Sequence, residues 1–402
     1  MSLNKWINDR LPIDDFVDQH LRHYYAPKNL NFLYFFGSLA MLCLGIQILS
    51  GIWLLMYYEP TVETAFDSVE YLMRDIPFGW LLRYTHAAGA SAFFVILYMH
   101  VYRALLYGSY RKPRELLWLL GLFLLILVMA ESYTGYILPW GQMSYWAAKV
   151  IMNIFGSIPV IGPPLMHLIQ GDYVISEATL QRFFAFHVVV FPMVLLGVVF
   201  IHLCALHTVG SNNPDGIEIK DNLDKDGIPV DGVPFHPYFT IKDIVAAVVF
   251  LIIFFAVIFY DPTFHGLILE KENFIPADPL VTPPEIKPTW YLAPYYAILR
   301  AVPDQLLGAL AMLASLFIFA FMPWLDRAPV KSMRYKGTRS RVSLFLFVVS
   351  FLSLMVLGLL PATPTNTILA RIATIVFFGF FLTLPYITVY DNHKTPPDRV
   401  RM

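Results

Sequence analysis

The sequence predicts an all-α polytopic membrane protein with eight transmembrane helices, the first four of which form a four-helix bundle. Hydrophobic residues make up 57% of the 402 residues and charged residues only 14%, a composition that excludes an ordinary soluble protein. Two apolar runs carry two histidines each, and ionisable side chains inside a membrane span usually mark a functional site. The formal net charge of −1 gives no indication of nucleic-acid binding.

Eight apolar runs are long enough to cross a lipid bilayer. They cover residues 32–57, 80–107, 116–139, 180–207, 244–260, 305–324, 342–361 and 367–389, and the fifth is the shortest. Residues 1–31 are polar and lack the apolar core of a cleaved signal peptide. We therefore expect an N-terminal segment (1–31), a four-helix bundle (32–208), a polar loop (209–243) and a C-terminal four-helix domain (244–402).

Two connections between the spans are long. The connection at 141–179 contains an aromatic-rich stretch, 143–155, that is typical of a helix lying at the membrane surface, and the connection at 261–304 is rich in proline. Loops of this length in a compact domain are usually functional.

Basic residues in the short loops predict the orientation, because such loops face the cytoplasm. The loop after the second span holds Arg111, Lys112 and Arg114, and the loop after the sixth holds six Lys or Arg residues between Arg327 and Arg341. The loop after the first span and the proline-rich loop are acidic and are expected outside. With eight spans, both termini and the loop 209–243 would then be cytoplasmic.

Four histidines in the second and fourth spans predict two layers within the bundle. His86 and His100 are fourteen residues apart, a helical rise of about 21 Å and nearly four turns, so both lie on one face at two depths. The fourth span runs in the same direction and carries His187 and His202. We expect His86 to pair with His187 near the outer face and His100 with His202 near the inner face, which is the geometry of two stacked cofactors.

Glycines in the neighbouring spans repeat the same spacing. Gly37 and Gly51 in the first span, and Gly121 and Gly135 in the third, are fourteen residues apart. Because these spans run in the opposite direction, Gly37 and Gly121 fall at the inner layer and Gly51 and Gly135 at the outer one. A flat macrocycle needs such room against a helix, although glycines also serve in ordinary helix packing.

These patterns predict two non-covalent b-type haems with four histidine ligands. Only Cys43 and Cys204 are present, so the chain has no covalent haem motif and no cysteine set for an iron–sulfur cluster. Two histidines per iron leave no open coordination position on the metal, which favours electron transfer over oxygen binding. Arg83, Arg103 and Arg182 lie near the ligands along the chain and match haem propionates, with interfacial snorkelling as the alternative.

Five stretches carry a resemblance to a known family: GYILPWGQMSYW (135–146), RFFAFH (182–187), HTVGSNNPDG (207–216), FHPYFTIKD (235–243) and WYLAPYYAILRAVPDQLLG (290–308). They resemble cytochrome b of the quinol–cytochrome c oxidoreductase, respiratory complex III, particularly its proteobacterial form. The resemblance implies a low-potential outer haem, a high-potential inner haem and a bacterial inner membrane. It also implies a dimeric complex with a Rieske-type iron–sulfur protein and a c-type cytochrome.

The same resemblance implies two quinone sites. Quinol would be oxidised near the outer face at Tyr136, the surface helix and the segment from residue 288 to Tyr291. Quinone would be reduced near the inner face at His207, Ser211, Lys242 and Asp243. Independently of the resemblance, a histidine and a carboxylate at the inner membrane edge are suited to proton uptake. The alternative is that His207 is a solvated histidine at a helix end and that Asp243 is an acid at a helix start, where the helix dipole favours it.

Two departures from the family pattern concern the outer site. The commonest pattern in the proline-rich loop is Pro-Glu-Trp-Tyr, whose glutamate is thought to accept a proton from quinol, and here Thr289 takes its place. We expect Glu285 to substitute, with the intramembrane Glu131 as the other candidate. Ala147 stands where many relatives have glycine, and this exchange is associated in the family with resistance to methoxyacrylate-type inhibitors.

The third departure is the spacing of His187 and His202, which is fifteen residues rather than fourteen. One extra residue rotates an ideal helix by about 100°, so both ligands could not face inward without a distortion. Pro192 lies between them, and the sequence therefore predicts a local bulge or kink there.

Two other classes of protein place histidines in membrane spans. A dihaem membrane anchor of a dehydrogenase or nitrate reductase also pairs histidines but typically has fewer helices. A secondary transporter with proton-relaying histidines would show internal sequence repeats, which are not evident in this sequence.

Overall fold

Eight helical segments of the described residues are long and apolar enough to cross a membrane, and the prediction of an all-helical chain with eight spans is confirmed. The computed structural model describes residues 3–11, 14, 18 and 23–401, so the N-terminal segment 1–31 is described only in part. The spans are η2 (Phe32–Phe35) with α3 (Phe36–Leu55), α5 (Gly79–Tyr107), α6 (Glu115–Ile137), α9 (Glu177–Ala185) with η3 (Phe186–Val190) and α10 (Phe191–Val209), η5 (Phe235–Phe239) with α11 (Thr240–Tyr260), α13 (Gln305–Phe317) with η7 (Ile318–Phe321) and α14 (Met322–Leu325), α15 (Thr338–Leu359) and α16 (Pro364–Tyr390).

Shorter elements occupy the connections. They are α1 (Leu3–Asn8), β1 (Tyr25–Pro27), α4 (Ala65–Arg74), α7 (Gln142–Gly156), α8 (Gly162–Gln170), η4 (Ile219–Asp221), β2 (Gly232–Pro234), η6 (Lys271–Phe274) and α12 (Ala293–Ala301). The aromatic-rich stretch predicted as a surface helix is α7. The helices α4 and α12 were not expected, because neither is long or apolar enough to stand out in a hydropathy profile.

The fifth span is longer than the sequence predicted. Its helix α11 begins at Thr240 rather than at residue 244, and Asp243 lies in its first turn. The polar residues of this first turn conceal the helix start in a search for apolar runs. An acidic residue there is favoured by the helix dipole.

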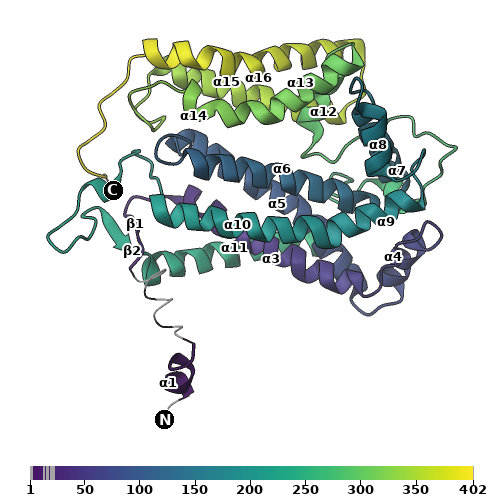
Figure 1. Cartoon of the computed structure of the whole chain (residues 1–402), viewed down its shortest axis with the longest axis horizontal. Helices are drawn as coiled ribbons and strands as arrows, with labels where there is room; N and C mark the ends of the chain where they lie inside the picture. Colours follow the sequence, from purple (N-terminus) through teal and green to yellow (C-terminus); the bar gives the residue numbers. More distant parts are fainter. Residues whose placement is uncertain (1–2, 12–13, 15–17, 19–22, 402) are drawn as a thin grey trace.

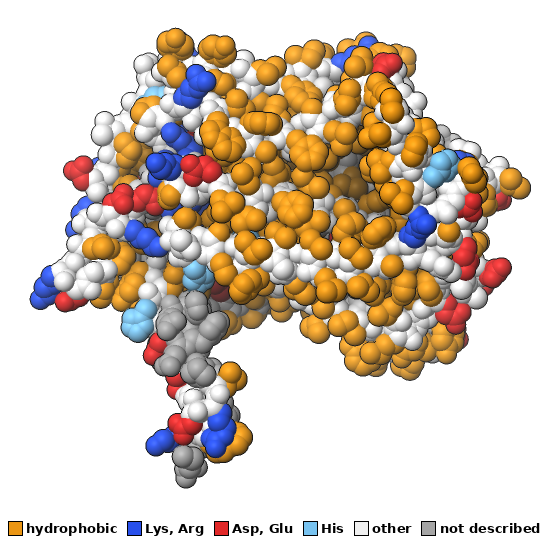
Figure 2. All heavy atoms as spheres, viewed as in Figure 1, with side chains coloured by type: hydrophobic (Ala, Val, Ile, Leu, Met, Phe, Trp, Pro, Cys, Tyr) orange, Lys and Arg blue, Asp and Glu red, His pale blue; other side chains and the backbone are white. Residues whose placement is uncertain are grey.

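The long helices lie roughly side by side, with α13, α15 and α16 forming one layer above the helices of the first bundle (Figure 1). The strands β1 and β2, which pair antiparallel, lie at one end of the helices near the C-terminus. The helices α4, α7 and α8 lie at the other end. Figure 2 shows hydrophobic side chains over the central surface and charged side chains mainly towards the two ends, as expected of a protein embedded in lipid.

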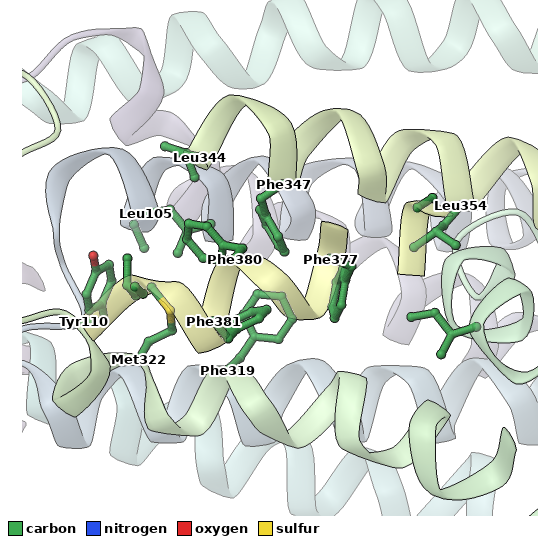
Figure 3. Close-up of a cluster of buried hydrophobic side chains, with 14 of the residues drawn as sticks. Leu105, Tyr110, Phe319, Met322, Leu344, Phe347, Leu354, Phe377, Phe380 and Phe381 are labelled. Carbon is green, nitrogen blue, oxygen red and sulfur yellow. The ribbon is translucent and has the colours of Figure 1, made fainter. Parts of the chain in front are cut away.

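A buried aromatic cluster joins the C-terminal helices to the first bundle (Figure 3). Phe347 of α15 and Phe380 of α16 pack with ring centroids 4.6 Å apart, and Phe319 of η7 packs edge-on against Phe381 at 5.0 Å. Trp118 of α6 donates a hydrogen bond from Nε1 to the carbonyl of Phe319, at 2.8 Å. The large apolar area of these rings holds the two halves of the molecule together.

Charged contacts fasten the loop 209–243 at the end where β1 and β2 lie. Asp231 is buried and accepts hydrogen bonds from Lys28 and Arg399, both at 2.8 Å. Burial alone would raise the pKa of Asp231, but the hydrogen bonds from Arg399 and Lys28 dominate and lower it to about 2. This carboxylate therefore links the residue that follows β1, the loop and the C-terminal residues.

Candidate functional site

The four histidines of the spans lie in two layers, each lining its own cavity. His86 of α5 and His187 of η3 line a cavity of about 280 Å³, with ring centroids 6.0 Å apart and planes at 84°. His100 of α5 and His202 of α10 line a second cavity of about 810 Å³. The structure thus brings the histidines together in the pairs that the sequence predicted. The larger cavity is the one at the β1–β2 end, since Tyr24 lines it.

Each of the four glycines faces one histidine ring at its own depth. A Cβ added to Gly37 would lie 3.4 Å from Cε1 of His100, and one added to Gly121 would lie 3.2 Å from Cε1 of His202. In the outer layer a Cβ at Gly51 would lie 3.2 Å from Cε1 of His86.

Gly135 is the tightest of the four. A Cβ there would overlap Cε1 of His187, and it would lie 2.7 Å from Nδ1 and 2.8 Å from Nε2 of the same ring. A side chain would therefore press on the ring at Gly51, Gly121 and Gly135, whereas at Gly37 it would only reach ordinary contact with the ring. Each glycine thus faces a histidine of the layer that the fourteen-residue spacing predicted.

The predicted bulge between the fourth-span histidines is present. Residues Phe186–Val190 form one turn of π-helix, in which the amide of Phe191 donates to the carbonyl of Phe186. Pro192 follows directly and has no amide hydrogen to continue the ladder. A π-turn absorbs one extra residue, so His187 and His202 both face the bundle interior despite a spacing of fifteen.

The donors around the cavities fit b-type haem. Ser50 donates its hydroxyl to the carbonyl of Ile46 at 2.6 Å, so its oxygen is left to accept from Nδ1 of His86 at 2.9 Å. This arrangement leaves Nε2 of His86 for a metal ion. Arg103 lines the larger cavity, and its Nε is buried without a hydrogen-bond partner among the described residues. A propionate carboxylate would satisfy that donor.

The other two arginines differ in their surroundings. Arg83 lines the smaller cavity, as a propionate-binding residue would. Arg182 donates to the carbonyl of Leu168, in the last turn of α8, and packs against Gly171. Its guanidinium is therefore bound by the C-terminal end of α8, and the described residues that line the smaller cavity do not include it.

A buried carboxylate adjoins Tyr136 at the α7 end of the molecule. Tyr136 donates a hydrogen bond to Glu270 at 2.9 Å, and Asn273 donates to both, at 2.9 Å to the Tyr136 hydroxyl and 3.1 Å to Glu270. Glu270 is 9% exposed. Burial raises its pKa to about 7, although the hydrogen bonds from Tyr136 and Asn273 oppose the shift. The group is thus poised to exchange a proton near neutral pH.

The remaining residues expected at the outer site differ in how deeply they are buried. Tyr291 and Thr289 are both buried, and the Tyr291 ring stacks on Phe94 with centroids 3.8 Å apart. Burial raises the pKa of Tyr291 to about 12, so its hydroxyl stays protonated. Glu285 is different: its side chain is 41% exposed and lies 3.6 Å from the Lys287 ammonium. Glu270 lies 134 residues from Tyr136 along the chain, and no pattern in the sequence marks it.

At the inner end, three of the four expected residues line the larger cavity. These are His207, Ser211 and Asp243. Asp243 accepts a hydrogen bond from the Ser38 hydroxyl at 3.0 Å. The fourth, Lys242, donates instead to the Tyr238 hydroxyl at 2.8 Å, and the described residues that line the cavity do not include it.

Tyr24 also lines the larger cavity, and the sequence did not indicate it. Its hydroxyl lies 3.1 Å from the Ser211 hydroxyl, and its ring packs against His207 with centroids 4.5 Å apart. It stands just before β1, in a polar N-terminal stretch with no pattern of its own. The pairing of β1 with β2 and the hydrogen bond from Lys28 to Asp231 bring that stretch to the cavity.

Comparison with known proteins gives the family. Residues 21–210 match the family model described as Cytochrome b/b6/petB, and residues 276–378 match Cytochrome b(C-terminal)/b6/petD. The chain is 53% identical to cytochrome b of Allochromatium vinosum over 98% of this chain and 97% of that protein. It is 45% identical to cytochrome b of Rhodospirillum rubrum over 98% and 94% of the two chains.

A solved structure agrees with these relatives. A chain of a hyperthermophilic respiratory complex III superposes with a TM-score of 0.89 at 37% identity, over 96% of this chain and 99% of the other. The chain therefore belongs to the cytochrome b family, as a cytochrome b of respiratory complex III.

Proposed function

We propose that this cytochrome b holds two non-covalent b-type haems, one between His86 and His187 and the other between His100 and His202. The observation that carries the proposal is the glycine that faces each of the four rings. Reversible one-electron transfer is the chemistry that each haem supplies when bound. Arg83 and Arg103 would bind propionates from the cavity walls.

Quinol is oxidised at the outer site beside Tyr136 and Tyr291. The reaction releases two protons and two electrons, of which one electron passes to an iron–sulfur partner and the other crosses the membrane between the two histidine layers. Glu270 accepts a proton, because it is buried, hydrogen-bonded to Tyr136 and has a pKa of about 7. Glu285, the earlier candidate, is half-exposed beside Lys287, which makes it the weaker choice.

Quinone is reduced at the inner site, where the larger cavity is lined by His207, Ser211 and Asp243. His207 and Asp243 supply protons to the two oxygens of the reduced ring, because an imidazole and a carboxyl group are suited to exchange protons near neutral pH. Tyr24 positions Ser211 and His207 through its hydroxyl and its ring. Lys242 would act from the edge of this site rather than from the cavity wall.

Other subunits complete the enzyme, since this cytochrome b is one subunit of respiratory complex III. We assign a Rieske-type iron–sulfur protein and a c-type cytochrome as its partners, in a dimeric complex in the bacterial inner membrane with the outer site facing the periplasm. A relative from Bradyrhizobium diazoefficiens is named Cytochrome b/c1, and this chain covers only 56% of it. That relative joins a cytochrome b portion to further sequence, as a partnership with a c-type cytochrome predicts.

Rapid mixing of the purified complex with quinol tests the proposal. Quinol should reduce the b haems within one turnover in the native complex. In His100→Leu, which removes an inner ligand, quinol should still reduce the outer haem, but the inner signal should be absent. Loss of both signals in a folded variant, or retention of both, would contradict the assignment of separate layers.

A further inference from the structure

Glu131 is an acidic residue inside the third span, and it contacts a histidine of the outer layer. The Nδ1 atom of His187 lies 2.9 Å from the backbone carbonyl of Glu131 and 3.1 Å from its side-chain Oε1. The other oxygen, Oε2, is buried and has no hydrogen-bond partner among the described residues. The functions proposed above make no use of this carboxyl group.

The third span offers an internal comparison, because its two layers repeat every fourteen residues. Glu131 stands four residues before Gly135, and Leu117 stands four residues before Gly121. The backbone of Leu117 interacts with His202, as the backbone of Glu131 does with His187. The side chains differ: leucine offers no hydrogen-bond acceptor, whereas glutamate does.

Among the described residues, the inner histidines lack the side-chain partners at Nδ1 that the outer histidines have. In the part of the chain that the structure describes, Nδ1 of His100 is buried without a hydrogen bond, and His202 interacts with the backbone of Leu117 but with no side-chain acceptor at Nδ1. In the outer layer, the Ser50 hydroxyl meets Nδ1 of His86 at 2.9 Å, and Glu131 meets Nδ1 of His187. Both outer rings are therefore hydrogen-bonded at Nδ1, and one of them faces a carboxyl oxygen.

The Nδ1–H of His187 donates to the backbone carbonyl of Glu131 with the carboxyl Oε1 beside it, and such oxygen partners at Nδ1 make the imidazole a better electron donor to a metal at Nε2. Stronger donation stabilises oxidised iron more than reduced iron, and hydrogen bonding around the site is one of the means by which a protein sets a haem potential. The asymmetry at Glu131 and Leu117 should therefore separate the potentials of the two layers.

We propose that Glu131 is a positioning residue that fixes the His187 ring through Nδ1 and lowers the reduction potential of the outer haem. This inference rests on the proposed function, because it requires His187 to be a haem ligand. The difference in side chains at matching positions of one helix thus adds to the difference in potential that favours electron transfer from the outer to the inner layer.

Redox titration of the two b-haem absorbance bands in the purified complex tests the proposal at one fixed pH. In Glu131→Leu the outer midpoint should rise, while the inner midpoint should stay where it is. Changes in such hydrogen-bonding partners commonly alter metal sites by about tenfold, which corresponds to about 59 mV for a one-electron couple. Glu131→Gln, which keeps a carbonyl acceptor, should give a smaller rise.

The converse variant is Leu117→Glu, which places a carboxyl group at the matching inner position and should lower the inner midpoint. Glu115→Gln is the control, because it removes an acid from the first turn of the same helix and should leave both midpoints unchanged. The proposal is overturned if the outer midpoint is the same in the native complex and in both Glu131 variants. It is also overturned if Glu131→Leu loses its haem while Glu131→Gln and Leu117→Glu move neither midpoint.

The haem assignment has a separate test. A native complex without two b-haem bands, or a His187→Leu variant that keeps the outer band, would disprove the proposed function itself.

Discussion

Replacing Gly135 by alanine should lower the content of the outer haem while leaving the inner one in place. A methyl carbon at residue 135 would overlap Cε1 of His187 and would lie 2.7 Å from its Nδ1, roughly 0.7 Å inside ordinary van der Waals contact. The ring cannot retreat freely, because its Nδ1 atom is held by Glu131. Overpacking of this kind costs about 1–3 kcal/mol, which corresponds to a roughly 5- to 150-fold lower affinity of the outer site for haem.

Gly37 provides the matched control, since a methyl carbon there would lie 3.4 Å from the nearest atom of His100. Gly37→Ala should therefore retain both haems. The assay is the reduced-minus-oxidised spectrum of the purified complex, with haem content measured per polypeptide. Equal haem content in Gly135→Ala and the native protein would refute the argument, and so would loss of the inner band rather than the outer one.

Three further predictions follow from named side chains. Glu270→Gln should slow quinol oxidation by about 10²-fold, the low end for a positioned general base. It should also abolish the rise in rate as pH increases through about 7, where Glu270 becomes ionised. Steady-state cytochrome c reduction measures both effects, with Glu285→Gln as the unchanged control, and an unaltered pH profile in Glu270→Gln would count against the prediction. Ala147→Gly should bind methoxyacrylate-type inhibitors more tightly, because the buried methyl group is removed from α7; inhibitor titration of the two forms would disprove this if their sensitivities were equal. Asp231→Asn should lower stability at pH 7 by roughly 1–2 kcal/mol, because the pKa of Asp231 is lowered to about 2 in the folded protein. This stabilisation exists above the unfolded pKa and is lost as pH falls through about 4 to 2. Melting curves of the two forms should therefore converge at low pH, and a gap that persists at pH 2 would show that the charge is not responsible.

The sequence predicted the features that follow from helical periodicity. Fourteen residues are close to a whole number of helical turns, so the layers of His86 and His100, and the glycines opposite them, followed from spacing alone. The π-turn before Pro192 could be predicted for the same reason, since fifteen residues do not fit an ideal helix. Hydropathy located the eight spans but missed the polar first turn of α11.

The sequence could not predict contacts that depend on how the loops fold back. Glu270 reaches Tyr136 from a loop 134 residues further along the chain, and nothing in its local sequence distinguishes it from the exposed Glu285. Tyr24 reaches Ser211 across 187 residues. Arg182 adjoins a predicted ligand in sequence, yet its guanidinium binds the Leu168 carbonyl, because side-chain direction depends on tertiary packing.

The most direct test of the two-layer account is the haem content and visible spectrum of the complex after removal of one ligand from each layer. The native chain should hold two b-type haems with separate absorbance bands and midpoint potentials. His86→Leu should lose only the lower-potential band, and His202→Leu only the higher-potential one. Two haems retained in both variants, or a single haem in the native complex, would contradict the account.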